Sequence, residues 1–121
     1  MQTIVIIEPH STQRAQLARW LRDDYLVFMA ADGVAGLALA ERHEPDLIFL
    51  ALTLPDLDGA AMVRQLKAQA RLRDIPMVAL PSPAMPGADV RARDAGCTDA
   101  FRAPLEEEHV SAMLTRWLGG G

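Results

Sequence analysis

Polar side chains that could do chemistry stand directly after two of the short apolar runs in this sequence. Glu8 and His10 follow the first run, and Asp56 and Asp58 follow the third. Carboxylates could hold a divalent cation or act as general acid and base, and a histidine could add a metal ligand. A metal site needs several ligands, however, and the sequence places no second His or Cys beside His10. We expect His10 to be a solvated loop residue and both aspartates to serve the turn before the next helix, with Asp58 as its N-cap.

The other nucleophile and cofactor candidates give weaker indications. Cys97 is the only cysteine, which excludes an internal disulfide, and its place at the start of an apolar run favours a buried side chain over a reactive thiol. His43 and His109 fall on polar helix faces and are expected to be solvated. Gly33 and Gly36 form no GxGxxG pattern, and the strand-end loops lack the aromatic and Ser/Thr-rich segments of a flavin site. No dinucleotide or flavin cofactor is predicted.

Two alternating patterns predict the scaffold that positions these residues. Short apolar runs predict five strands, and the first four runs are almost continuously apolar, as in strands covered on both faces: Thr3–Ile7, Tyr25–Met29, Asp46–Leu50, Ile75–Leu80 and Thr98–Arg102. Helical spacing of apolar residues predicts five helices between and after them: Thr12–Asp23, Gly33–Arg42, Gly59–Gln69, Met85–Ala95 and Glu107–Leu118. Right-handed β–α–β crossovers then give an α/β fold with a parallel sheet and helices on both faces. Functional groups are expected at the carboxyl ends of the strands.

Capping residues agree with these helix boundaries. Asp32 and Asp58 stand immediately before two predicted helices as N-caps, and Gly96 follows the fourth helix as a C′ residue.

Composition limits the class of protein and its partners. The chain has 121 residues, of which 50% are hydrophobic and 23% charged, which is typical of one ordered domain; we assign residues 1–118 to it and 119–121 to a glycine linker or an expression remnant. Twelve basic and 16 acidic residues give a net charge of −4, which argues against nucleic acid and anionic membranes as partners. The longest uncharged stretch, Ile75–Ala88, is too short and too rich in proline to span a bilayer. The lack of a signal sequence and the single cysteine predict a cytoplasmic protein.

The run Pro45–Gly59, PDLIFLALTLPDLDG, resembles the central segment of bacterial response-regulator receiver domains. Further segments match in the family's order and spacing along essentially the whole chain: Ile4–Glu8, Ala30–Gly33, Asp74–Leu80, Asp94–Gly96 and Ala103–Leu105. The resemblance implies a flavodoxin-like (βα)5 three-layer sandwich with strand order 2-1-3-4-5. It also implies a cis peptide bond between Ala103 and Pro104.

The positions that carry the family's chemistry are substituted in this chain. The resemblance places the phosphoacceptor aspartate at position 51, where the methyl group of Ala51 offers no nucleophile. Of the two acids that hold Mg²⁺ after the first strand, Glu8 remains and Pro9 replaces the other, so Thr53 could add only its carbonyl oxygen. We therefore expect no metal, no cofactor and no catalytic residue.

The family's switch residues are substituted as well. Its Ser or Thr after strand four aligns with Pro81, its lysine after strand five with Ala103, and its aromatic switch with Ala100. Together these positions predict a degenerate phosphorylation pocket, and the chain is interpreted as a pseudo-receiver. The pocket consists of Glu8, Pro9, Ala51, Thr53, Pro81 and Ala103.

Receivers of this type communicate through the face made by the fourth helix, the fifth strand and the fifth helix. Strand alternation leaves open whether Phe101 or Arg102 is the exposed residue there. The resemblance implies a phosphorylation-independent protein–protein interaction and regulatory module of bacterial two-component signal transduction. It would not be an enzyme, and it would act on a protein partner or a fused output domain, with a homodimer as a further option. The predicted interaction face consists of Arg91, Arg93, Phe101, Arg102, Glu107 and Met113.

Two alternatives stay open at this point. The emptied pocket could bind a small ligand, which would make the chain a sensing domain. A residual Mg-dependent phosphoacceptor or catalyst could instead use Glu8, His10 or Asp56.

Overall fold

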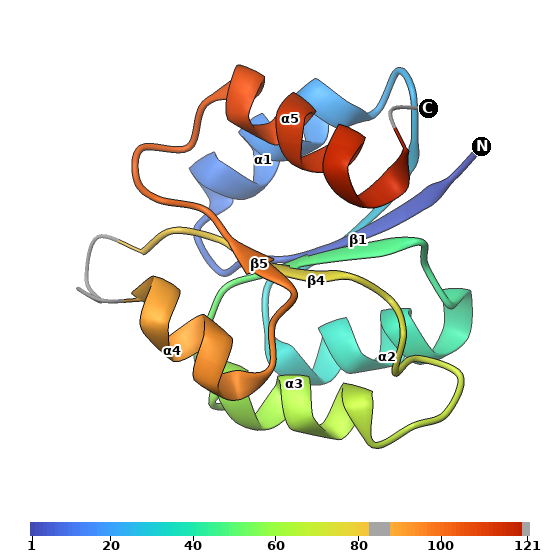
Figure 1. Cartoon of the computed structure of the whole chain (residues 1–121), viewed down its shortest axis with the longest axis vertical. Helices are drawn as coiled ribbons and strands as arrows, with labels where there is room; N and C mark the ends of the chain where they lie inside the picture. The colour runs from blue at the N-terminus through green and yellow to red at the C-terminus, as the bar shows by residue number, and fades with distance from the viewer. Residues whose placement is uncertain (83–87, 120–121) are drawn as a thin grey trace.

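The computed structural model describes residues 1–82 and 88–119, in which strands and helices alternate along the chain (Figure 1). The strands are β1 (Thr3–Ile7), β2 (Leu26–Ala30), β3 (Leu47–Leu50), β4 (Met77–Ala79) and β5 (Asp99–Ala100). The helices are α1 (Ser11–Leu21), α2 (Gly33–His43), α3 (Gly59–Lys67), α4 (Ala88–Ala95) and α5 (Glu107–Leu118).

All strand pairs are parallel and the order is β2-β1-β3-β4-β5, so the predicted flavodoxin-like α/β fold is confirmed. The register sets the last residues of the five strands level with one another. These residues are Ala30, Ile7, Leu50, Ala79 and Ala100. The loops that follow the strands therefore all start at one edge of the sheet.

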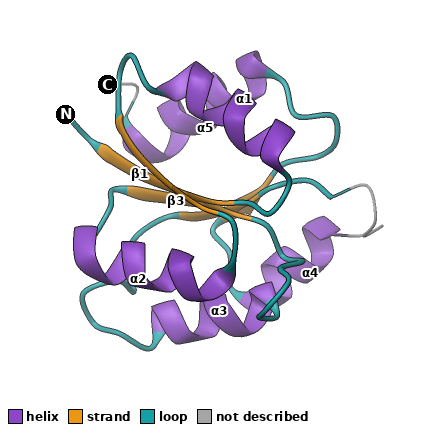
Figure 2. Cartoon of the chain, turned by 180° about the vertical axis from the view of Figure 1, so that it is seen from behind, coloured by secondary structure: helices purple, strands orange, loops and turns teal. Residues whose placement is uncertain are grey.

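Two helical layers enclose the sheet, with α1 and α5 on one face and α2, α3 and α4 on the other (Figures 1 and 2). All four residues of β3 and the last four of β1 are buried, because these central strands have a strand on each side and helices above and below. Met62, Val63 and Leu66 of α3 pack in one core layer. Leu17 and Leu21 of α1, with Val110 and Leu114 of α5, pack in the other.

The expectation that the second apolar run is covered on both faces is wrong. Leu26 and Met29 of β2 are 48% and 49% exposed. The reason is that β2 lies at the edge of the sheet, where β1 is its neighbour and the helices cover it only in part. A continuous apolar run is compatible with a central or an edge strand and does not distinguish them.

The predicted helix boundaries agree closely with the structure. Asp32 and Asp58 are N-caps, as predicted, and accept hydrogen bonds from Ala35 N (2.8 Å) and Ala60 N (3.3 Å). Gly96 has φ of +96°, the left-handed conformation expected of a glycine after a helix. The first residues of the predicted helix Met85–Ala95 lie outside the described residues.

Two further features, one peptide bond and the length of the helices, bear on the predictions made from the sequence. The Ala103–Pro104 peptide is cis, as the resemblance implied. None of the described helices is long and apolar enough to cross a membrane.

Candidate functional site

The level strand ends bring three of the predicted pocket residues to one place. Ala51 N–H donates a hydrogen bond to the carbonyl of the last residue of β1 at 2.8 Å, which sets Ala51 beside Glu8. Leu80 N–H donates a hydrogen bond to the carbonyl of Leu50, the last residue of β3, at 2.8 Å. This bond brings Pro81 to the same edge of the sheet. Glu8, Ala51 and Pro81 are buried, while Pro9 next to them is partly exposed.

The last two of the six predicted pocket residues, Thr53 and Ala103, are exposed. Thr53 forms an isolated antiparallel bridge with Asp58 in the loop between β3 and α3. Ala103 lies in the loop after β5, where it borders a hollow against α5. Thr53 and Ala103 thus differ from Glu8, Ala51 and Pro81 in being exposed to solvent.

The carboxylate of Glu8 is only 1% exposed, and both of its oxygens have hydrogen-bond partners within the chain. Its Oε1 accepts a hydrogen bond from the Gln13 side-chain amide. Its Oε2 accepts from the backbone N–H of His10 at 3.3 Å and lies 3.4 Å from the His10 ring Nδ1. His10 is solvent-exposed, as predicted, but its contact with Glu8 was not foreseen.

Two side chains at the start of α1 fasten that helix to the strand ends. Gln13 Nε2 donates to the Pro81 carbonyl at 3.3 Å as well as to Glu8, so one amide group links the ends of β1 and β4. Arg14 Nη1 donates to the carbonyls of Glu8 (2.8 Å) and Pro9 (3.3 Å). The sequence analysis missed both residues. Their only sequence signal is a long polar side chain in the first turn of the helix that follows Glu8.

The residues at these strand ends do not fit a magnesium site. Mg²⁺ needs near-octahedral oxygen ligands anchored by carboxylates. Glu8 supplies a carboxylate whose oxygens are already hydrogen-bonded, whereas Ala51 and Pro9 have no side-chain ligand atom. No group of three or more His, Cys, Asp and Glu side chains that could hold a metal occurs within residues 1–82 and 88–119. The methyl group of Ala51 also lacks an atom that could attack phosphorus.

Asp56 has a structural role that differs from the predicted one. Its carboxylate accepts hydrogen bonds from the backbone N–H groups of Gly33 (2.8 Å) and Val34 (2.9 Å), the first two residues of α2. These bonds lower the pKa of Asp56 below its ordinary value of 3.8, because they stabilise the ionised form. The loop after β3 is thereby attached to the N-terminus of α2, whereas the sequence predicts that Asp56 serves the turn before α3.

The structure also shows the surroundings of Cys97, the remaining candidate nucleophile, and of the other two histidines, His43 and His109. Cys97 is buried, as predicted, and burial raises the pKa of its thiol to about 11. His43 is only partly exposed, because its ring stacks on Phe28 with the ring centroids 3.7 Å apart. His109 is exposed, as predicted, and borders the hollow against α5.

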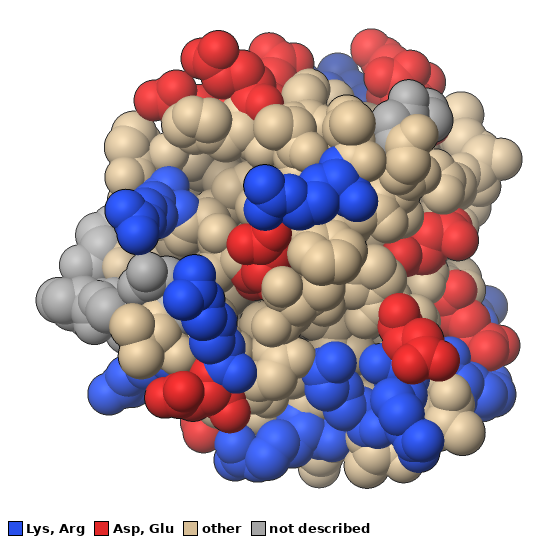
Figure 3. Space-filling view, in the orientation of Figure 1, with Lys and Arg blue, Asp and Glu red and all other residues tan. Residues whose placement is uncertain are grey.

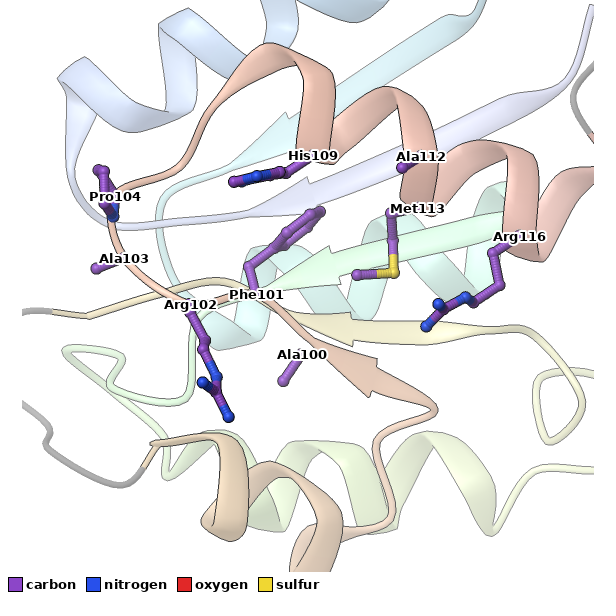
Figure 4. A pocket seen from close by; sticks show the side chains of 9 residues that line it. All are labelled: Ala100, Phe101, Arg102, Ala103, Pro104, His109, Ala112, Met113 and Arg116. Atoms are coloured by element: carbon purple, nitrogen blue, oxygen red, sulfur yellow. The ribbon is translucent and has the colours of Figure 1, made fainter.

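A hollow of about 300 Å³ lies between β5 and α5, on the predicted interaction face (Figure 4). Met113 and the small side chains of Ala100 and Ala112 line it, and Phe101 forms part of its base. The lining residues His109, Ala112, Met113 and Arg116 were not singled out as a group, although their helical spacing places them on one side of α5.

The structure settles the orientation of Phe101 and Arg102, which strand alternation left open. Phe101 is 6% exposed and its ring centroid lies 5.7 Å from that of Phe49 in the core, while Arg102 is exposed. Arg91, Arg93 and Glu107 are exposed and Met113 is partly buried. Within this set, Phe101, Arg102 and Met113 border the hollow.

A network centred on Asp99 connects β5 to α5 next to this hollow. Asp99 accepts hydrogen bonds from Arg116 Nη1 (2.9 Å), Trp117 Nε1 (3.1 Å) and the backbone N–H of Ala100 (2.9 Å). Partial burial would raise the pKa of Asp99, but these three hydrogen bonds outweigh it and hold the pKa below the ordinary value. The carboxylate is therefore ionised at neutral pH and fixes the last turns of α5 against the start of β5.

Charge is unevenly distributed over the face that Figure 3 shows. Acidic side chains gather along the top, over α5, and Lys and Arg side chains gather along the bottom, over α3. Around β5, in the middle, single basic and acidic side chains lie among uncharged surface (Figure 3). The acidic start of α5 contains Glu106, Glu107 and Glu108. A hollow with apolar walls and basic borders is typical of a modest protein-binding surface.

Comparison with known proteins agrees with this architecture. Residues 4–115 match the model of the response regulator receiver domain family. The polar-differentiation response regulator DivK of Brucella ovis is 32% identical over 95 residues, which cover 78% of this chain and 77% of DivK. The receiver domain of the Pseudomonas aeruginosa sensor histidine kinase PA1611, with a magnesium ion in its active site cleft, has 31% identity and a TM-score of 0.89, covering 98% of each chain.

A second solved structure gives the same result. The receiver domain of a signal transduction histidine kinase from Syntrophus aciditrophicus has 29% identity and a TM-score of 0.87, covering 99% of this chain and 92% of its own. The fold, the order of its segments and these matches lead to one conclusion: the chain belongs to the response regulator receiver domain family of two-component signal transduction.

Proposed function

We propose that this receiver domain works without accepting a phosphoryl group, as a protein-interaction module of bacterial two-component signalling. The observation that carries the proposal is Ala51, the residue directly after β3 at the buried strand edge. Phosphoryl transfer to a receiver needs an aspartate oxygen at this position as the nucleophile, and an alanine methyl group has no lone pair. We therefore infer neither phosphoacceptor nor enzyme activity.

The surroundings of Glu8 support the same proposal. The PA1611 receiver domain has a magnesium ion in its cleft, whereas here the Gln13 amide and the His10 N–H occupy the oxygens of the one acid that remains after β1. Displacing these donors would leave a metal with a single carboxylate, because Pro9 offers none. The pocket is thus better suited to hold the strand ends together than to bind Mg²⁺.

The output of such a module is a binding surface, and the α4–β5–α5 face is the best candidate. The hollow between β5 and α5 has apolar walls and lies next to exposed arginines, a combination that suits a protein partner or a fused output domain. We infer that this partner binds in the cytoplasm and that its binding does not depend on phosphorylation.

Labelling with radioactive acetyl phosphate in the presence of Mg²⁺ tests the first half of this proposal. A phosphorylatable receiver serves as the positive control. We expect no label on the wild-type chain and little label on Ala51→Asp. In that variant Pro9 still lacks the carboxylate of the second acid, and Ala103 still lacks the positive charge of the lysine. Mg²⁺ with beryllofluoride should leave the thermal midpoint unchanged, since a ligand that binds the native state must raise it. Labelling of the wild-type chain would refute the proposal.

Quantitative capture of partners from the native cell tests the second half. Arg93→Glu reverses one exposed charge on the face, and Arg42→Glu makes the same change on α2, away from β5. We expect Arg93→Glu to lose partners that the wild-type chain and Arg42→Glu retain, with or without acetyl phosphate. Equal capture by both variants would contradict the assignment of the face, and capture only after phosphorylation would contradict phosphorylation independence.

A further inference from the structure

The free edge of β2 has backbone groups that can form hydrogen bonds with another strand. In the ladder with β1, Leu26 N–H donates to the Gln2 carbonyl (2.9 Å), and the Ala30 carbonyl accepts from Glu8 N–H (3.0 Å). Parallel pairing uses every second residue of a strand, so Leu26, Phe28 and Ala30 face β1. The N–H and C=O groups of Val27 and Met29 consequently face outward. Among residues 1–82 and 88–119 these groups have no hydrogen-bond partner.

This edge also lacks the features that usually prevent strands from pairing. Edge strands are commonly protected by charged residues, proline or a bulge. The sequence of β2 is LVFMA, with no charged residue and no proline, and its register with β1 is regular over all five residues. Leu26 and Met29 are about half exposed, although both are large apolar side chains.

We propose that β2 pairs with β2 of a second copy of this chain, antiparallel and about a twofold axis at Phe28. The outward-facing residues, Val27 and Met29, are equally distant from Phe28 in the sequence. A twofold axis there sets Val27 of each copy opposite Met29 of the other. Each such pair exchanges two N–H···O=C bonds, so all four outward groups of each strand are satisfied. The half-exposed Met29 then packs beside Val27 of the other copy, and Leu26 lies opposite its Ala30.

Self-complementarity is the reason to choose a second copy over another extended peptide. The pattern of outward donors and acceptors is symmetric about Phe28, and the exposed apolar side chains meet apolar partners in this register. The contact is small, and each copy has a net charge of −4, so the dimer belongs to the weak class and should strengthen as salt screens the repulsion. Because β5 is at the opposite edge of the sheet, both α4–β5–α5 faces stay accessible at the two ends of the dimer.

Sedimentation and amide exchange on the full chain test this pairing together. Between micromolar and millimolar concentration, the apparent mass should rise from 13.2 kDa toward twice that value, and more so at high salt. As the concentration rises, the hydrogen-exchange rate of the Val27 and Met29 amides should fall in proportion to the fraction of monomer that remains. Exchange at the Phe28 and Ala30 amides, which are bonded to β1 in both states, should not change with concentration.

Two lysine variants separate this edge from general effects of charge. Met29→Lys places a charge in the contact and should abolish dimerisation. Val34→Lys makes the same change on α2 at a side chain that is 63% exposed and should leave dimerisation at its wild-type strength. Far-UV circular dichroism checks that both variants fold. If Met29→Lys does not fold, the test rests on the wild-type chain, in which the Val27 and Met29 amides but not the Phe28 and Ala30 amides should become protected as the concentration rises. A chain that stays monomeric at millimolar concentration, or dimerises without protecting Val27 and Met29, overturns the proposal.

Discussion

Replacing Gln13 by alanine tests whether its amide is what satisfies the buried Glu8 carboxylate. The substitution removes the partner of Glu8 Oε1 and the link to the Pro81 carbonyl. Because Glu8 is only 1% exposed, solvent does not readily replace the lost donor. A hydrogen bond to a charged group contributes about 1.5–3 kcal/mol, and the higher helix propensity of alanine returns a few tenths of that. We therefore expect Gln13→Ala to lower the free energy of unfolding by about 1–3 kcal/mol.

Gln16→Ala is the matched control for this measurement. Gln16 is in the same helix, and its side chain has no hydrogen bond among the described residues, so the two substitutions share the change in helix propensity and differ in the contact to Glu8. In a domain of this size the expected loss corresponds to a fall of roughly 3–12 °C in the thermal midpoint. Urea unfolding at neutral pH gives the free energies directly. If the two variants agree within about 0.5 kcal/mol, the size of an ordinary surface effect, the Gln13 contact does not stabilise the fold.

Three further outcomes are expected. Gly59→Ala should lower stability by about 1–3 kcal/mol in urea unfolding, because its Cβ would lie 2.4 Å from the Leu52 Cα; an unchanged midpoint would contradict this clash. Cys97 should react slowly with iodoacetamide at pH 8 in the native state and rapidly in urea, since its pKa of about 11 leaves little thiolate; fast native labelling would show an accessible thiol. Asp56, whose folded pKa is lowered, stabilises the fold above pH 3.8 and loses this effect as the pH falls, so Asp56→Asn should lose less stability in acid than the wild type.

Local sequence patterns were sufficient to predict the elements of this fold. The apolar runs and helical spacing gave the bounds of β1 and α5 as the structure has them, because these patterns follow from side-chain periodicity alone. The edge position of β2 depends on strand order, which was predicted from the family resemblance. The exposure of Leu26 and Met29 follows from that order and is not expressed in the apolar run itself.

In the candidate site, the sequence predicted which residues stand at the strand ends. It did not predict the contacts between residues of different elements. Ala51 and Pro9 follow from the alignment of a strand end, so the sequence located them. The partnership of Glu8 with Gln13 depends on how α1 lies against β1 and β4, and no spacing rule expresses that orientation. The attachment of Asp56 to α2 was missed for the same reason, since it joins residues 22 and 23 positions apart.

The loop after β3 explains why family membership and phosphoryl chemistry are separate questions for this chain. Asp56 holds the N-terminus of α2, Asp58 caps α3, and Gly59 lies where a side chain would meet the backbone of Leu52. All three lie within the segment Pro45–Gly59 that carries the resemblance, and the contacts they make in the fold do not involve residue 51. A sequence search that finds this loop therefore detects inherited geometry. In any such protein, the residue directly after the third strand, which is Ala51 here, must be inspected separately before the protein is assigned a place in a phosphorelay.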